Sequence, residues 1–141
     1  MTIRVKGSRI SRRDQVLNKY TNQVKAIVKA GGQMVMNEAK QSIHSLSSGG
    51  ETYEKYNPRR THTASPAGKP PNTDTGYLAN NIFLVVDADG MGASVESRAE
   101  YSEYLEFGTS KMDARPFMQP ALEANRRKII QMYARLKSRG A

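Results

Sequence analysis

The stretch Tyr101-Ser-Glu-Tyr-Leu-Glu-Phe-Gly-Thr-Ser-Lys-Met-Asp-Ala-Arg-Pro-Phe-Met-Gln-Pro-Ala-Leu122 decides how this chain folds. Large apolar and aromatic side chains are dense in it, and Gly108, Pro116 and Pro120 lie among them. Aromatic rings bury a large area, while Gly and Pro restrict the path of the backbone. The stretch therefore predicts an anchored crossing between two elements. Gly108 can end a short helix over about 101–107, and Pro116 suits the first turn of the next helix.

Two long segments have the apolar periodicity of helices. Over about 12–46, apolar residues recur at steps of three or four and form one stripe. The segment of about 117–138 repeats the pattern, and its opposite face is basic. The pair Gly31–Gly32 falls inside the first helix, where each glycine costs about 1 kcal/mol relative to alanine. The pair predicts a kink, a close approach of another backbone, or a hinge.

Short segments between and before the helices predict strands. Residues 2–6 alternate polar and apolar, and Ile82–Val86 is apolar on both faces, as expected of a central buried strand. Asp89–Gly90 is a hairpin signal, and the alternation over 93–98 predicts a half-exposed return strand. A further short strand is predicted near 110–112.

These segments together predict an α+β fold in a single domain spanning residues 1–141. Two long helices pack against a small antiparallel sheet of three to four strands. Between about 47 and 72 the periodicity disappears, and the composition is polar and rich in Pro and Gly. The sequence therefore predicts a long mobile loop there, which orders on assembly or is a plain insertion.

The composition limits the classes of partner. Lys and Arg number 22 against 13 Asp and Glu, which gives a formal net charge of +9. Such a charge favours contact with nucleic acid or with an acidic protein surface. The chain has no Cys, which excludes disulfides and Cys-based metal sites. No apolar run approaches the length of a membrane span, so we expect no membrane contact.

Two patterns resemble catalytic or metal-binding signals. Asp74-Thr75-Gly76 spells the aspartic-protease triplet, but that chemistry needs two carboxylates that share a proton. The sequence instead favours Asp74 as the cap of a short helix over about 75–80. His44 and His62 are the only histidines, and no carboxylates surround them at metal-binding spacing.

Glu100, Glu103 and Glu106 share one helical face and predict a solvated or subunit-facing acidic patch. We therefore expect no catalytic residue, no metal and no cofactor. A hydrolase that depends on His44, His62 or Asp74 is the alternative with the least support.

Basic side chains gather near the N-terminus, in the 47–72 loop and on the last helix. They form either a solvated face or a surface that contacts DNA phosphates or an acidic partner ring. No helix-turn-helix spacing or zinc site accompanies them. The candidate DNA or acidic-partner contacts are Arg59, Arg60, Lys69, Arg126, Arg127 and Lys128.

Three segments carry a family resemblance. Tyr104-Leu-Glu-Phe-Gly-Thr-Ser-Lys-Met-x-Ala-Arg-Pro-Phe-Met-x-Pro-Ala-Leu122 resembles the signature of the HK97 gp10-like family of tailed-phage neck and tail-completion proteins. Pro71-Asn-Thr-Asp-Thr-Gly-Tyr-Leu-Ala-Asn-Asn-Ile82 is similar to a second family segment, with Asn81 in place of the usual Ser. The start, Ile3-x-Val5-x-Gly7 before a long helix, is a weaker third match.

The resemblance implies a non-enzymatic virion structural protein at the head–tail junction. It would complete the tail or neck so that the tail joins a DNA-filled head. It implies a homo-oligomeric ring, hexameric in the particle and assembled in the host cytoplasm. The implied partners are head-closure, tail-terminator or tail-tube proteins and genomic DNA in the channel. Expected subunit or partner contacts are Tyr53, Tyr56, Phe107, Thr109, Lys111, Met112, Arg115 and Phe117. The alternative is a small basic nucleic-acid-binding protein without a virion role.

Overall fold

The computed structural model of the protein describes residues 12–139, with only the backbone of 137–139. The elements follow in the order α1 (Arg12–His44), β1 (Thr52–Tyr56), β2 (Arg59–Thr63), α2 (Tyr77–Asn80), β3 (Ile82–Val86), β4 (Ala93–Ser97), α3 (Ser102–Phe107) and α4 (Met118–Arg139). The predicted α+β class is confirmed. The strand predicted for residues 2–6 lies outside the described residues.

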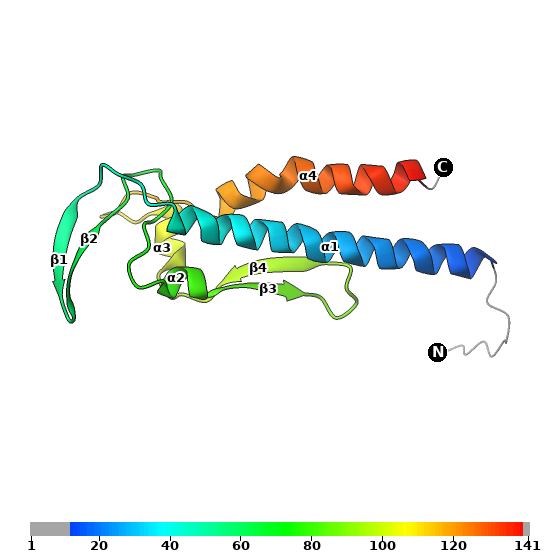
Figure 1. Cartoon of the computed structure of the whole chain (residues 1–141), viewed down its shortest axis with the longest axis horizontal. Coiled ribbons are helices and arrows are strands. Elements are labelled where there is room, and N and C mark those ends of the chain that lie inside the picture. Colours follow the sequence, from blue (N-terminus) through cyan, green and yellow to red (C-terminus); the bar gives the residue numbers. More distant parts are fainter. Residues whose placement is uncertain (1–11, 140–141) are drawn as a thin grey trace.

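Helix α1 forms the middle layer, with α4 along one side and the β3–β4 hairpin along the other (Figure 1). Its buried face consists of Gly31, Val35, Ala39 and Ile43, at helical spacing. The predicted helix over 12–46 is thus confirmed to within two residues of its C-terminal end. The helix predicted over 117–138 corresponds closely to α4.

Gly31 and Gly32 allow α4 and the β3–β4 hairpin to pack against opposite sides of the same turn of α1. A Cβ added at Gly31 would lie 3.2 Å from Cγ1 of Ile129 on α4. A Cβ added at Gly32 would lie only 2.4 Å from Cδ1 of Leu84 on β3. The pair therefore makes room for side chains from both neighbours, so the close approach predicted for it involves side chains rather than a second backbone.

The strands form two separate antiparallel sheets of two strands each within residues 12–139. In one, β1 pairs with β2, and in the other β3 pairs with β4, with Leu84 opposite Val95. Strands β3 and β4 pair as predicted for the antiparallel sheet, and the β1–β2 hairpin is a further sheet that the sequence did not predict. In place of the strand predicted near 110–112 there is one isolated bridge, between Thr109 and Met112.

The prediction that β3 is a central buried strand is wrong. Ile82 is fully buried, but Phe83 and Val86 are 38% and 39% exposed. Phe83 is exposed because the sheet has only two strands and one face packed on α1, so the other face meets solvent. Val86 shares the face of Ile82 and Leu84, and it is exposed at the end of the strand next to the hairpin turn. Arg98 covers part of that face, with its guanidinium 4.4 Å from the Phe83 ring centroid.

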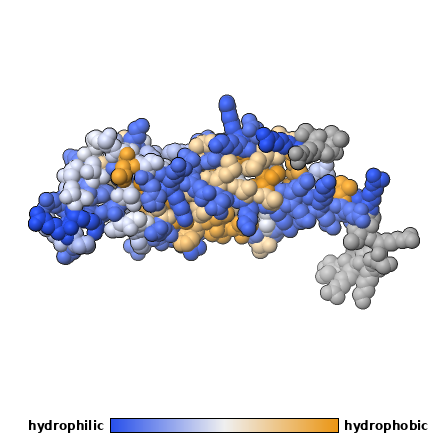
Figure 2. All heavy atoms as spheres, in the orientation of Figure 1, coloured by the Kyte–Doolittle hydropathy of each residue, from blue (hydrophilic) through white to orange (hydrophobic). Residues whose placement is uncertain are grey.

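The prediction of a structureless loop over 47–72 is also wrong, because β1 and β2 form a regular hairpin there. It lies at one end of the elongated molecule, beyond the C-terminus of α1 (Figure 1). Figure 2 shows that this end is hydrophilic, whereas apolar residues gather over the central part of the molecule. The core there is small and includes Ile43, Ile82 and Phe117 as its largest fully buried side chains.

Candidate assembly surfaces

The crossing after α3 is anchored at both of its ends. Gly108 has φ of 74° and directs the chain out of α3, as its position in the sequence predicted. The backbone N–H of Arg115 donates to the carbonyl oxygen of Leu105 at 2.6 Å. The Arg115 side chain donates from Nε to the carbonyl oxygen of Ser65 at 2.9 Å, which ties the crossing to the segment after β2. Arg115 is therefore occupied within its own chain.

Glu106 closes the N-terminus of α4. Its Oε2 accepts hydrogen bonds from the backbone N–H groups of Phe117 (2.9 Å) and Met118 (3.0 Å), and its Oε1 accepts one from Gln119 (2.9 Å). A carboxylate at this position satisfies otherwise unpaired donors and complements the helix dipole. The prediction of a solvated or subunit-facing acidic patch is thus wrong for Glu106.

The β1–β2 hairpin is attached to the rest of the molecule through Asp74. Its carboxylate forms an ion pair with Lys55, accepts two hydrogen bonds from Arg60 at 2.8 and 3.0 Å, and lies 3.8 Å from His62 Nδ1. These contacts, chiefly the hydrogen bonds from Arg60 and Lys55, lower the pKa of Asp74 to about 2. The prediction that Asp74 caps α2 is wrong, since Gly76 occupies the cap position and no side chain bonds there.

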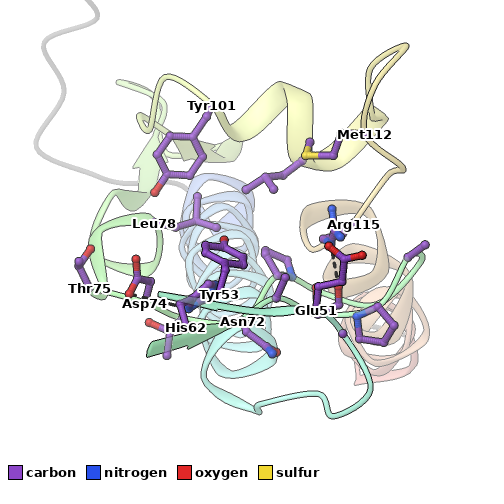
Figure 3. Close-up of a pocket in the computed structure, with 18 of the residues that line it drawn as sticks. Glu51, Tyr53, His62, Asn72, Asp74, Thr75, Leu78, Tyr101, Met112 and Arg115 are labelled. Carbon is purple, nitrogen blue, oxygen red and sulfur yellow. Dashed lines mark hydrogen bonds and ion pairs between the residues drawn. The ribbon is translucent and has the colours of Figure 1, made fainter. Parts of the chain in front are cut away.

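A cavity of about 750 Å³ lies between this hairpin and the body. Figure 3 shows Tyr53, His62 and Asp74 on its hairpin side, with Tyr101 and Met112 facing them. Burial raises the pKa of the Tyr101 hydroxyl. The rings of His62 and Tyr53 pack edge to face, with their centroids 5.4 Å apart. The residues next to His62 along the chain gave no indication of this contact.

The expected partner contacts differ in exposure. Among the large hydrophobic side chains that the structure describes, Phe107 and Tyr56 are the most exposed, at 81% and 72%. Tyr53 is 45% exposed, and Thr109 and Lys111 are also exposed, whereas Met112 and Arg115 are half-buried. Phe117 is fully buried in the core, so its side chain is absent from the surface of the monomer.

The basic candidates fall into two groups. Three form ion pairs within the chain: Arg59 with Glu54, Arg60 with Asp74, and Arg126 with Glu123. The other three, Lys69, Arg127 and Lys128, are exposed and have no ion pair within the described residues.

A second concavity, of about 710 Å³, runs along α1 between α4 and β4; we call it the α1 groove. Ile27, Val28 and Val35 form its floor. Its walls are Met118, Leu122, Ile129 and Tyr133 of α4 on one side and Met91, Ala93 and Val95 on the other. Phe107 and Glu106 close one end. No local sequence pattern predicts this groove, because it arises from the arrangement of three elements.

Residues 12–139 contain no cluster of three or more His, Cys, Asp or Glu side chains that could hold a metal ion. His44 is exposed at the C-terminal end of α1. Within the same range, no helix is both long and apolar enough to cross a membrane.

The sequence of the chain matches the family model described as "Bacteriophage HK97-gp10, putative tail-component" over residues 10–108. This match covers more than half of the chain, so the protein belongs to the HK97 gp10-like family of phage tail components. The match includes α1, both hairpins and α3, and it ends at Gly108, before the rest of the crossing and α4. No curated protein and no solved structure gives a significant match to the chain.

Proposed function

We propose that this protein is a non-enzymatic structural component of a tailed-phage particle that acts at the head–tail junction. There it completes the tail or neck, so that the tail joins a DNA-filled head. Membership of a family of phage tail components is the observation that carries this proposal. The protein would reach the virion after assembly in the host cytoplasm.

The proposal includes a ring of copies around the tail axis, with six copies in the particle. A head-to-tail ring requires two different surfaces on each copy. Two unlike surfaces are available in the described residues: a polar hairpin with exposed Tyr56 at one end and an apolar groove near the middle. This difference supports a ring rather than a contact between identical patches. The neighbouring rings would be head-closure, tail-terminator or tail-tube proteins.

Electron microscopy of particles made without this gene tests the junction role. Separate DNA-filled heads and full-length tails are the expected result, because the joint between them is missing. Joined, intact virions would overturn the proposal.

Complementation of that knockout tests the contacts. Tyr56→Ser combined with Phe107→Ser should leave the protein folded but reduce joining, because both side chains are largely exposed. Tyr104→Ser is the matched control, since Tyr104 is also exposed, at 58%, but lies outside the expected contact set. Equal joining by both variants would remove Tyr56 and Phe107 from the interface.

A nucleic-acid-binding protein without a virion role is the second candidate, favoured by the unpaired cations Arg127 and Lys128 on α4. It predicts that the isolated protein binds DNA at physiological salt and that binding falls steeply with added salt. Arg127→Glu with Lys128→Glu should abolish that binding. Joined virions in the knockout together with salt-sensitive DNA binding would favour this candidate over the junction role.

A further inference from the structure

Strand β4 has one edge that no strand of the described chain pairs with, and this edge faces the α1 groove. Ala93 and Val95 of β4 line the groove, whereas no residue of β3 does. Hydrogen bonds from Asp87 N–H to the Gly92 carbonyl and from Arg98 N–H to the Asn81 carbonyl fix the alternation of the ladder. Ala93, Val95 and Ser97 therefore direct their backbone N–H and C=O groups away from β3.

The groove and its surroundings specify the chemistry of an occupant. An open strand edge beside apolar side chains favours an added strand whose alternate residues are apolar. The hairpin segment from 82 to 97 has three carboxylates and no cation, whereas α1 and α4 on the other sides of the groove are basic. Glu96 lies on the outer face of β4, and Asp87 and Asp89 lie at the turn of the hairpin. The occupant should therefore carry cations at its outward positions.

This chain contains one segment with that pattern. Thr2-Ile-Arg-Val-Lys6 alternates apolar Ile3 and Val5 with basic Arg4 and Lys6, and residues 1–11 contain no acidic side chain. We propose that the α1 groove binds residues 2–6 of a second copy as a strand added to β4. Ile3 and Val5 would enter the groove beside Ala93 and Val95, and Arg4 and Lys6 would lie near Glu96 and Asp87. The inference rests on the proposed ring and identifies the contact that joins its subunits.

The length of the chain favours a second copy over the same copy. Ala93 lies beside Gly32, since their Cβ positions are 3.5 Å apart. Gly32 is twenty residues after Arg12 on α1, a distance of about 30 Å along the helix. A fully extended chain spans at most about 25 Å between Val5 and Arg12. In the register that places Val5 beside Ala93, the same copy therefore falls short of the groove, and Val95 lies further along in the same direction.

Cysteine pairing in the full-length protein tests this contact, because the chain has no Cys of its own. Val5→Cys in one preparation and Ala93→Cys in a second, differently tagged preparation are mixed under mild oxidation. The expected product is a covalent heterodimer, in at least about tenfold excess over the matched pair of Val5→Cys with Ala134→Cys. Ala134 is an exposed residue of α4 and serves as the random-collision control. Equal yields from the two pairs would overturn the proposal.

Two further variants make the test decisive. Val95→Cys in place of Ala93→Cys repeats it at the next inward-facing residue, in case one substitution disturbs the hairpin. A single chain that carries both Val5→Cys and Ala93→Cys should form disulfides between copies. A disulfide within the monomer would overturn the exchange between copies.

The test of this contact can fail independently of the test of the junction role. Cross-linking is measured on the isolated protein, whereas the junction role is measured on particles from the knockout. Separate heads and tails without selective cross-linking would retain the junction role and remove this contact. Selective cross-linking with joined virions would retain the contact and remove the junction role.

Discussion

The two hairpins of this molecule have equal strand lengths but are held in place by different forces. Strands β3 and β4 lie on α1, with Ile82 fully buried and Leu84 beside Gly32. Strands β1 and β2 have no fully buried residue, and Lys55 and Arg60 converge on Asp74. Apolar burial contributes about 25 cal/mol per Å² and is not weakened by charge screening, whereas partly exposed ion pairs contribute little and are screened by salt. The β3–β4 hairpin therefore contributes to the core, whereas the β1–β2 hairpin can exchange its contacts for others with little loss of folding free energy.

Among changes to the two hairpins, the largest effect is expected where β3–β4 meets the core. Ile82→Ala should lower the free energy of unfolding by about 2–5 kcal/mol, because it removes fully buried methyl groups. Urea denaturation followed by circular dichroism measures this loss. Val86→Ala on the same strand, where the side chain is 39% exposed, should cost less than half as much. Equal losses would mean that β3 is not anchored by Ile82.

The carboxylate of Glu106 tests whether a charged group outside the β1–β2 hairpin also contributes to stability. Glu106→Ala should lower the free energy of unfolding by about 1–2 kcal/mol, since three backbone N–H groups at the start of α4 lose their acceptor. Glu103→Ala is the matched control on the same helix, is exposed, and should change stability by less than about 0.5 kcal/mol. Thermal melts of the two variants compare them directly, and indistinguishable melts would contradict the role of Glu106.

The β1–β2 hairpin should respond locally. Asp74→Asn removes the shared anion of Lys55 and Arg60 and should lower global stability by about 1 kcal/mol or less. Hydrogen exchange should quicken at the β1 and β2 amides while those of β3 and β4 stay protected. Glu54→Gln removes only the exposed pair with Arg59 and should leave exchange nearly unchanged. Faster exchange in both hairpins would break the comparison.

The same carboxylate gives the hairpin a pH dependence of known sign. The pKa of Asp74 is lowered from 3.8 to about 2, so the folded state favours the charged form. The stabilisation is therefore fully present above about pH 4 and is lost as the pH falls through about 2. Exchange at the β1 and β2 amides, corrected for intrinsic rates, should accelerate in that window in the wild type. The Asp74→Asn variant should show no such step.

The smallest effect on folding is expected at the most exposed side chain. Phe107→Ala should change the free energy of unfolding by less than about 0.5 kcal/mol, because Phe107 is 81% exposed. Chemical denaturation measures it against Phe117→Ala, which should lose about 3–5 kcal/mol as the buried aromatic of the same crossing. A large loss for Phe107→Ala would mean that it packs within the monomer and is not an assembly contact.

Sequence periodicity was sufficient for the parts of the fold that bury an apolar face. Helices α1 and α4 and strand β4 were predicted near their observed bounds because each repeats apolar residues at its own period. Strand β3 was predicted from its continuous apolar run, and α3 from the glycine that ends it. The β1–β2 hairpin was missed for the opposite reason. Neither strand buries an apolar side, and residues 59–63 are Arg-Arg-Thr-His-Thr, so the sequence has no hydrophobic periodicity there.

The contacts that position the candidate surfaces were harder to predict because they are not local. Asp is a residue type typical of helix caps, yet the carboxylate of Asp74 binds Lys55 and Arg60, which lie well before it in the sequence. Glu106 caps a helix that begins only at Met118. Phe117 was expected at an interface, and its full burial depends on how α4 docks on α1. The α1 groove likewise exists only once three elements are in place.

Helix α1 has a mechanical consequence for any assembly that includes this chain. Its 33 residues span about 50 Å, from beyond the turn of β3–β4 to the base of the β1–β2 hairpin. Its hydrogen bonds run parallel to the axis, so the helix resists extension and acts as a strut between contacts at its two ends. Gly31–Gly32 is the point where such a strut would bend most easily, but Ile129 and Leu84 clamp that point from opposite sides. A load applied at one end would therefore pass to the other as tension or compression rather than be absorbed by a hinge.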